Sequence, residues 1–247
     1  MAAIARRSAA VNEAKQLLRG TIRSRVRALS AAELSRQSES VVEQLTSHEW
    51  FASARCVCCY IPMAGKELDT YQLLHAILSS GRQCLVPRVF GSRPAEMAML
   101  PVASVAELES LPKNKWGIPE HPVEALREQR GLDATHATEG VSALEAQIDL
   151  LVVPAVAYDR EGHRLGQGRG YYDSFVQRLR AAQAGSEIQV KTVGLGLHCQ
   201  ILAPGQVPVD DLDETLDLVL GPAMAPLTQE DGSSEPDGRP SWNSGAS

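Results

Sequence analysis

Three glycines alternate with other residues in the segment RLGQGRGYYD, residues 164–173. Glycine has no Cβ atom and readily adopts positive φ, so this pattern lets a ligand approach the backbone closely. The segment precedes a predicted helix, and the free N–H groups at a helix N-terminus bind anions. Arg164 and Arg169 add positive charges whose geometry suits phosphate oxygens. These residues predict a phosphate or nucleotide site; the alternative is a glycine turn that only packs a helix on a strand.

Asp173 closes this segment, just inside the predicted helix. Its carboxylate could be a favourable charge at the helix N-terminus, or a magnesium ligand beside bound phosphates. The segment lacks the Gly-Lys-Ser/Thr of a Walker A motif, and it is no clean dinucleotide fingerprint. Motif spacing alone therefore does not choose a nucleotide class.

A second cationic element lies near the N-terminus. Lys15, Arg19, Arg23 and Arg27 are four residues apart, so they share one face of a predicted helix. Like charges at this spacing destabilise a helix by roughly a few tenths of a kcal/mol per pair. Lys15 and Arg19 are interpreted as candidates for anion binding, and Arg23 and Arg27 as a solvated basic face.

A late run, VPVDDLDETLD, concentrates acidic side chains. One of them could complete a metal site with Asp173, and most are expected in solvent. The five are Asp210, Asp211, Asp213, Glu214 and Asp217.

Composition narrows the function classes. The chain has 247 residues, is 44% hydrophobic and carries a formal net charge of −6, which argues against bulk nucleic-acid binding. No apolar run approaches the ~18 residues of a membrane span. No coiled-coil seam or interface run is evident, so a monomer is expected. The five cysteines are odd in number and match no zinc spacing, and Cys56, Cys58 and Cys59 are interpreted as small buried strand residues.

The first ten residues, MAAIARRSAA, are basic and free of acids. They faintly resemble a transit peptide, but they are short and continue into a predicted helix. Cytoplasmic location is the expectation, with mitochondrial import as the alternative.

Strands alternate with helices along the chain, which predicts an α/β protein: a sandwich with a mostly parallel central sheet. The helices are expected at about 11–29, 31–46, 70–79 and 105–111 and after residue 170; the strands at 55–61, 83–89, 96–102, 148–159, 192–197 and 216–220. Residues 1–222 are expected to form a single domain, with a surface insertion at 121–147 and a disordered tail at 223–247. The glycine segment follows the strongest strand, where such sheets bind ligands.

Five motifs, in order, resemble the 5-formyltetrahydrofolate cyclo-ligase (methenyltetrahydrofolate synthetase) family. RLGQGRGYYD is similar to the family signature, and the similarity runs from Val11 to Leu220. The other four are AKQLLRGTIRSRVRALS, MAGKELDT, LPKNKWGIPE, and GLGLHCQ followed by VPVDDLDETLD. The resemblance implies a Rossmann-like three-layer sandwich, similar to sugar-phosphate isomerases and CoA-transferases.

The resemblance also implies a reaction. ATP and 5-formyltetrahydrofolate (folinate, possibly polyglutamylated) would give 5,10-methenyltetrahydrofolate, ADP and phosphate, with Mg²⁺ as cofactor. The formyl oxygen would attack the γ-phosphate, and nitrogen 10 of the folate would then displace phosphate from the resulting imidate phosphate. Positioning and charge neutralisation would be the protein's main tasks.

Site roles follow from the same resemblance, motif by motif. The catalytic residues would be Lys15, Arg19, Arg169 and Tyr172. ATP would contact Lys15, Arg19, Arg164, Leu165, Gly166, Gln167, Gly168, Arg169, Gly170, Tyr171 and Tyr172. Folate would contact Ile61, Glu67, Trp116, Gln167, Gly168, Arg169, Gly170 and Tyr171. Asp173 and Asp213 would be associated with the metal.

Three departures from the family pattern bear on these roles. One residue more than expected precedes Glu67, which puts the register there in doubt; Gln167 stands where some relatives carry a cation; and Leu212 replaces a histidine. Two other functions are kept as alternatives. A non-catalytic folate- or nucleotide-binding paralogue would keep the fold without turnover, and an isomerase- or CoA-transferase-like enzyme would not need the glycine segment.

Overall fold

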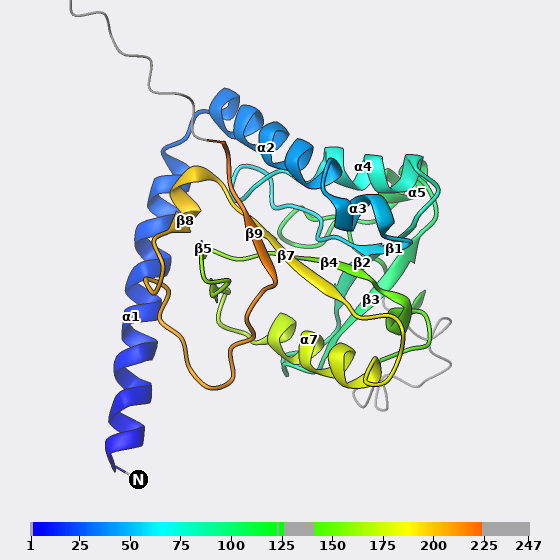
Figure 1. The fold of residues 1–247 in the computed structure, drawn as a ribbon. Helices are drawn as coiled ribbons and strands as arrows, with labels where there is room; N and C mark the ends of the chain where they lie inside the picture. The colour runs from blue at the N-terminus through cyan, green and yellow to red at the C-terminus, as the bar shows by residue number, and fades with distance from the viewer. Residues whose placement is uncertain (1, 123, 126–140, 224–247) are drawn as a thin grey trace, which may run out of the picture.

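A six-stranded sheet forms the centre of the molecule in the computed structural model, which describes residues 2–122, 124–125 and 141–223. Its strand order is β3-β2-β1-β4-β7-β9, and every neighbouring pair is parallel except β2 and β3. The strands are β1 (Cys56–Cys58), β2 (Gln83–Val89), β3 (Met97–Val102), β4 (Leu150–Val153), β7 (Lys191–Leu195) and β9 (Leu218–Leu220). Figure 1 shows the arrangement.

Helices cover both faces of this sheet. Side chains of α2 (Ala31–Thr46) and α4 (Tyr71–Ser79) pack with Val57 and Val152 on one face. Side chains of α7 (Tyr171–Ala182) pack with Cys58 and Val153 on the other. Figure 1 shows α2 and α4 above the sheet and α7 below it. The predicted three-layer α/β sandwich with a mostly parallel sheet is confirmed, and burial on both faces explains why β1 and β4 are apolar throughout.

The predicted strand at 148–159 is two strands in two sheets. Pro154 follows β4, and because proline has no N–H to donate, it ends the sheet ladder there. The chain then forms β5 (Ala157–Asp159), which lies between β6 (Arg164–Leu165) and β8 (Ile201–Leu202) in a small second sheet. Burial continues through the break, since Tyr158 is inaccessible and donates its hydroxyl to the Val153 carbonyl at 2.7 Å.

Three other predictions need correction. The strand predicted at 55–61 is paired only over β1, although Tyr60 and Ile61 beyond it remain buried. The first helix, α1 (Ala2–Arg27), begins earlier than predicted, and the short α3 (Glu49–Ser53) was not predicted. The remaining predicted elements, including α5 (Val105–Ser110), lie within two residues of their expected bounds.

The insertion predicted at 121–147 is not wholly on the surface. His121 is buried at its start and Glu145 is buried at its end, where the Glu145 carboxylate accepts the Met99 N–H at 2.8 Å. Glu145 begins a short 3-10 helix, η1 (Glu145–Gln147). Residues 123 and 126–140 of the insertion, and 224–247 of the predicted tail, lie outside the described residues.

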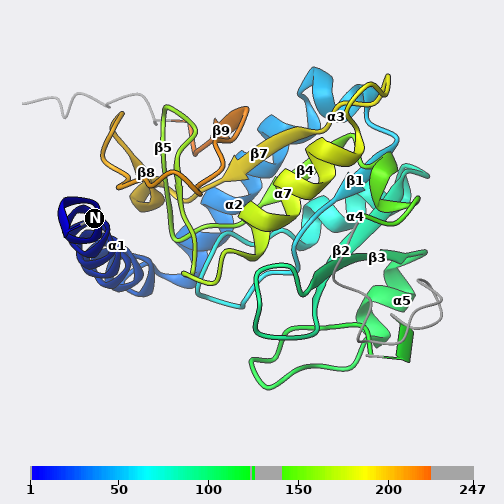
Figure 2. The same ribbon diagram turned by 90° about the horizontal axis from the view of Figure 1, so that it is seen from below.

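Helix α1 stands at one edge of the molecule, beside β5 and β8 (Figure 2). It packs through Ile22 and Val26 near η2 (His198–Gln200), while Leu17 is exposed. Among the helices described, none has both the length and the hydropathy that crossing a bilayer requires.

Candidate functional site

A cavity of about 1250 Å³ opens where β1, β2 and β4 end. From β1 the chain passes through α4 to β2 on one side, whereas from β4 it passes through α7 to β7 on the other. The cavity therefore lies at the point where the strand order reverses, which is the usual ligand position in open parallel sheets. Its volume is above the usual range of about 300–1,000 Å³ for a single small-molecule pocket.

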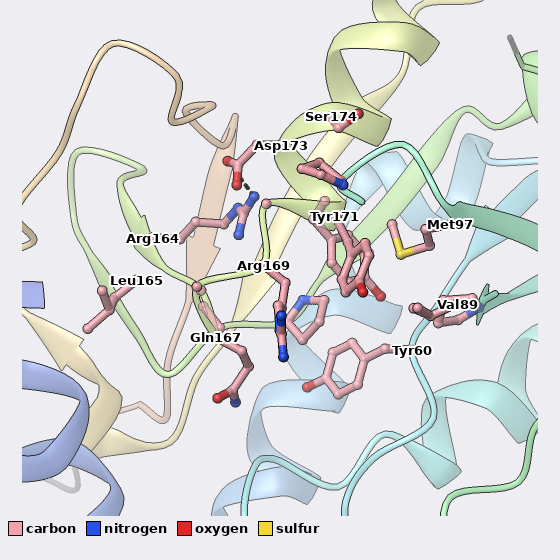
Figure 3. A pocket seen from close by; sticks show the side chains of 18 of the residues that line it. Tyr60, Val89, Met97, Arg164, Leu165, Gln167, Arg169, Tyr171, Asp173 and Ser174 are labelled. Atoms are coloured by element: carbon pink, nitrogen blue, oxygen red, sulfur yellow. Dashed lines mark hydrogen bonds and ion pairs between the residues drawn. The ribbon is translucent and has the colours of Figure 1, made fainter. Parts of the chain in front are cut away.

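All residues for which the sequence predicted a site role line this one cavity. They are Lys15, Arg19, Ile61, Glu67, Trp116, Arg164, Leu165, Gly166, Gln167, Gly168, Arg169, Gly170, Tyr171, Tyr172, Asp173 and Asp213. Arg169 extends into the space toward Tyr60, whereas Leu165 points away (Figure 3). The Leu165 side chain is buried in the core, so a ligand could meet this residue only at its backbone.

Each of the three glycines in the loop is needed for its shape, for reasons that differ. Gly168 and Gly170 have φ of 92° and 68°, which other residues rarely adopt. At Gly166 a Cβ atom would lie 3.1 Å from Nη1 of Arg164, so that position is restricted by space. Gly170 caps α7, whose first N–H groups therefore follow directly from the loop. The loop and helix together form an anion-binding arrangement.

Three cationic side chains of α1, on successive turns, reach the loops around the cavity. Lys15 Nζ donates to Asp210 Oδ2 at 2.8 Å and to Asp213 Oδ2 at 2.5 Å. One turn later, Arg19 Nε donates to the Gly166 carbonyl at 2.8 Å. These contacts join α1 to both the glycine loop and the late acidic loop.

Arg23, on the next turn, donates to the Gln167 side-chain oxygen. Arg23 is exposed, as expected for a solvated basic face, and it has this one contact with the glycine loop in addition. Arg27 is exposed and its Nε donates to the Arg23 carbonyl of its own helix, as a surface residue would.

Lys15 is a buried charge with two carboxylate partners. Its side chain is only 7% exposed. Burial lowers the pKa of Lys15, but the hydrogen bonds to Asp210 and Asp213 outweigh it and leave that pKa raised. The pKa of Asp210 is lowered, mainly by the same hydrogen bond. The site therefore holds a fixed ammonium group before any ligand arrives.

Arg164 and Asp173 form the second buried ion pair. Arg164 Nη2 lies 2.6 Å from Asp173 Oδ1, and the arginine side chain is 4% exposed. The same Asp173 oxygen accepts the Glu214 N–H at 3.1 Å, so Asp173 lies next to the Asp213 segment. Nε of Arg164 is buried with no hydrogen-bond partner in the described part of the chain.

The two aspartates fit a magnesium ion that also binds phosphate. Mg²⁺ in proteins usually takes one or two carboxylates together with substrate oxygens. Only Oδ1 of Asp173 and Oδ2 of Asp213 take part in the hydrogen bonds described, which leaves one oxygen on each for a metal. A separate group, Asp159, Glu161 and His163, lies outside the cavity lining, and its Asp159 carboxylate accepts the N–H groups of the other two in a tight turn.

The tyrosines of the loop have different surroundings. Tyr171 donates its hydroxyl to the Gly91 carbonyl at 2.7 Å. The Tyr172 hydroxyl is buried without a hydrogen-bond partner in the described part of the chain, and burial raises its pKa. Tyr172 therefore offers an unused hydroxyl proton at the cavity.

The other predicted residues, Ile61, Glu67 and Trp116, line further parts of the cavity. Ile61 is buried beyond β1, and Glu67 is buried six residues later, so the extra residue before Glu67 has not removed it from the cavity. Burial raises the pKa of Glu67 to about 7. The Met63 N–H donates to the carboxylate at 2.7 Å, which lowers that pKa by less than burial raises it. Trp116 is 61% exposed.

Sequence reasoning did not single out three residues of the lining that form ion pairs. Asp210 was one of five acids with equal claims, and only its contact with Lys15 distinguishes it. Arg88 and Glu120 form an ion pair across 32 residues and belong to no local motif. Most of the late acids are exposed, as expected, whereas Glu214 is half-buried and pairs with Arg180 at 2.6 Å.

Fold and cavity together define an α/β protein with a glycine loop and buried cations at the strand-order reversal, an arrangement suited to an anionic ligand. Comparison with known proteins is more specific. The model of the 5-formyltetrahydrofolate cyclo-ligase family matches residues 11–222. The chain therefore belongs to the 5-formyltetrahydrofolate cyclo-ligase family.

Individual relatives agree with this assignment. A Mus musculus 5-formyltetrahydrofolate cyclo-ligase is 31% identical over 85% of this chain and 94% of its own length. A mitochondrial 5-formyltetrahydrofolate cyclo-ligase of Arabidopsis thaliana is 31% identical over 87% of this chain and 76% of its own. Among solved structures, the Aquifex aeolicus 5,10-methenyltetrahydrofolate synthetase superimposes with a TM-score of 0.60 at 26% identity, over 83% of this chain and 88% of the other.

Proposed function

We propose that this protein converts 5-formyltetrahydrofolate and ATP to 5,10-methenyltetrahydrofolate, ADP and phosphate, with Mg²⁺. The observation that carries the proposal is the division of one large cavity into two walls. Lys15, Arg19 and the glycine loop supply cations and free N–H groups on one wall, as a triphosphate requires. Glu67 and Trp116 supply a buried carboxyl and an exposed indole on the other, as a polar planar ring requires.

The first step transfers the γ-phosphoryl group. The formyl oxygen forms a bond to the γ-phosphorus while the bond to the ADP oxygen breaks, which gives an imidate phosphate and ADP. Lys15, Arg19 and Arg169 neutralise the charge that develops on the phosphoryl oxygens. Arg169 is exposed in the cavity and forms no ion pair with any described residue, so its charge is available to the ligand.

The second step closes the ring. Nitrogen 10 bonds to the formyl carbon as the bond from that carbon to the phosphorylated oxygen breaks. Phosphate leaves with the original formyl oxygen and takes up the proton that nitrogen 10 loses. Tyr172 supports the proposal because its buried hydroxyl can donate to a phosphate oxygen that replaces the missing partner. The protein's part in both steps is to hold the two substrates in register and to exclude water.

Asp173 and Asp213 would hold the magnesium ion. When bound, the ion would neutralise charge on the β- and γ-phosphates. Arg164 would hold the Asp173 carboxylate in place, and Lys15 would do the same for Asp213.

The protein is proposed to act in the cytoplasm as a monomer. The five cysteines form no disulfide, and four of them are buried, which suits a reducing compartment. Few large apolar side chains are exposed in the described part of the chain, namely Leu17, Trp116, Val209 and Leu212, and two of these line the cavity.

The direct test is the absorbance of the methenyl product after purified protein is mixed with folinate and MgATP. The expected rise requires both substrates and falls sharply in Lys15→Ala and Asp173→Ala, whereas Arg27→Ala, on the same helix face but outside the cavity, keeps the activity. No rise despite folinate binding by calorimetry would mean a folate-binding paralogue. No rise and no folinate binding would reject the proposed function.

A further inference from the structure

A tight hairpin forms part of the cavity wall opposite α1. Residues 113 and 119 form an antiparallel bridge, and the Glu120 N–H donates to the Pro112 carbonyl at 2.9 Å. At the turn, Gly117 has a φ of 79° and donates its N–H to the Asn114 carbonyl at 2.9 Å. These bonds give the segment a defined shape, with Trp116 at its tip.

The two ends of this hairpin are fixed in the body of the protein, and its tip is not. Leu111 and His121 are both buried, directly before and after residues 112–120. Trp116 is exposed, and the Lys115 ammonium lies 4.4 Å from the centroid of its ring. Apart from this contact with its neighbour, the position of Trp116 depends on how the base of the hairpin holds its backbone.

One buried ion pair connects the base to the central sheet. Arg88, in β2, has a side chain 11% exposed and donates through Nη1 to Glu120 Oε1 and to the Val89 carbonyl, the latter at 2.7 Å. The second carboxylate oxygen of Glu120 accepts Asn114 Nδ2 at 2.9 Å. Asn114 Oδ1 in turn accepts the Trp116 N–H at 2.9 Å. An unbroken series of hydrogen bonds thus runs from β2 to the backbone of Trp116.

We propose that Arg88 and Glu120 are positioning residues for the folate substrate: they hold the hairpin so that the Trp116 indole forms a wall for the flat heteroaromatic ring. The inference rests on the proposed function. A stacked ring stabilises binding beyond the burial of its area, and that gain depends on the partner being held in place beforehand. Arg88 Nε is buried without a partner in the described part of the chain, so this guanidinium is not a fully satisfied structural group.

Glu120→Gln tests the pair with little change in volume. The variant can still accept from Arg88, but the amide nitrogen cannot accept from Asn114, so the series of hydrogen bonds is broken. We expect the KM for folinate to rise about tenfold, the KM for ATP to stay within twofold, and kcat to fall by less than threefold. Glu33→Gln, in the exposed Glu33–Arg36 pair of α2, is the matched control and should leave all three unchanged.

A readout without turnover comes from the indole N–H signals of ¹⁵N-tryptophan-labelled protein. The chain has three tryptophans, and Trp116→Phe assigns the relevant signal. In Glu120→Gln the Trp116 signal should shift or broaden in the absence of ligand. Adding folinate should then change that signal less than it does in the wild type. The Trp50 signal should stay the same. The exchanged pair, Arg88→Glu with Glu120→Arg, should recover part of the folinate KM that either single reversal loses.

The outcomes separate this inference from the proposed function. If the wild-type protein forms no methenyl product, the proposed function fails, and the indole spectra still report whether the pair holds the hairpin. If the wild type is active but Glu120→Gln matches Glu33→Gln in folinate KM and in the Trp116 signal, the positioning role is wrong. An equal rise in the KM for ATP and for folinate would also overturn it, because that would indicate general loosening of the fold.

Discussion

The two walls of the cavity are built in different ways. On the α1 side, Lys15 and Arg164 are buried cations paired with carboxylates, and those carboxylates also line the cavity. On the hairpin side a single buried ion pair, Arg88–Glu120, supports an exposed aromatic ring. The first side presents several charges to the cavity, whereas on the hairpin side the buried pair lies at the base of a segment that carries an aromatic ring.

The difference follows from the ligands proposed for the two walls. A triphosphate brings strong charge that water would otherwise solvate, so fixed cations and metal-binding carboxylates must already be in place. A planar ring gains mainly from contact and from orientation. Substitutions on the α1 side should therefore slow phosphoryl transfer, and substitutions on the hairpin side should weaken folate binding.

Lys15→Met should give the largest effect. Methionine keeps the length of the side chain and removes the ammonium group, so phosphoryl transfer loses one fixed charge and kcat should fall about 100- to 1000-fold. Steady-state kinetics of methenyl formation measures this. Gln16→Met places the same residue on the neighbouring, exposed position of α1 and should have no effect; a fall of less than tenfold for Lys15→Met would contradict the role of this wall.

Asp173→Asn should lower both stability and magnesium use. The change leaves Arg164 buried beside a neutral amide, which should reduce the free energy of unfolding by about 1–3 kcal/mol, and it removes a metal-binding charge. Urea denaturation and a magnesium titration of activity measure the two effects. Asp211→Asn removes an equal charge from an exposed neighbour of Asp213 and should change neither; an unchanged magnesium requirement in Asp173→Asn would rule out this metal site.

Glu67 should make stability depend on pH. Its folded pKa of about 7 exceeds the ordinary value of 4.5, so its contribution is complete below pH 4.5 and is lost as pH rises through about 7. The gain in stability from Glu67→Gln should therefore grow between pH 4.5 and pH 8, by about 3 kcal/mol. Denaturation at a series of pH values measures this, with the exposed Glu109→Gln as control; parallel curves for wild type and Glu67→Gln would show that Glu67 is not protonated near neutrality.

Arg23→Ala should give the smallest effect. Its contact with Gln167 is exposed, and exposed pairs contribute little, so the KM for ATP should rise only about twofold to threefold. Arg27→Ala removes the same side chain one turn later, without a contact to the loop, and should have no effect. Identical ATP kinetics for the two variants would show that Arg23, like Arg27, has no role in ATP binding.

The sequence predicts the α1 wall better than the hairpin wall. The reason is that more of the residues of the α1 wall lie close together in the sequence. The glycine loop expresses its chemistry in ten consecutive residues, and the spacing of four in α1 places Lys15 and Arg19 on one face. Arg88 and Glu120 are 32 residues apart, and Lys15 and Asp210 are 195 apart, so nothing local marks either pair. Only folding distinguishes Asp210 from the other acids of its run, whereas Asp213 was distinguished by the family resemblance and not by local chemistry.

The fold, too, could be predicted from the sequence only in part. Alternating strands and helices predict the three layers, because apolar runs such as β4 are buried on both faces. The break at Pro154 was missed because burial continues through Tyr158, and hydrophobicity alone does not say which sheet a strand joins. That break matters for the site, since it turns the chain from β4 toward the glycine loop.

The most direct test of the two-wall account is separate binding of each substrate by calorimetry. Wild type, Lys15→Met and Glu120→Gln would each be titrated with a non-hydrolysable ATP analogue in magnesium, and with folinate alone. The account predicts that Lys15→Met loses at least tenfold in affinity for the nucleotide and keeps that for folinate, and that Glu120→Gln does the reverse. Equal weakening of both ligands in either variant, or the opposite pattern, would contradict the division of the cavity.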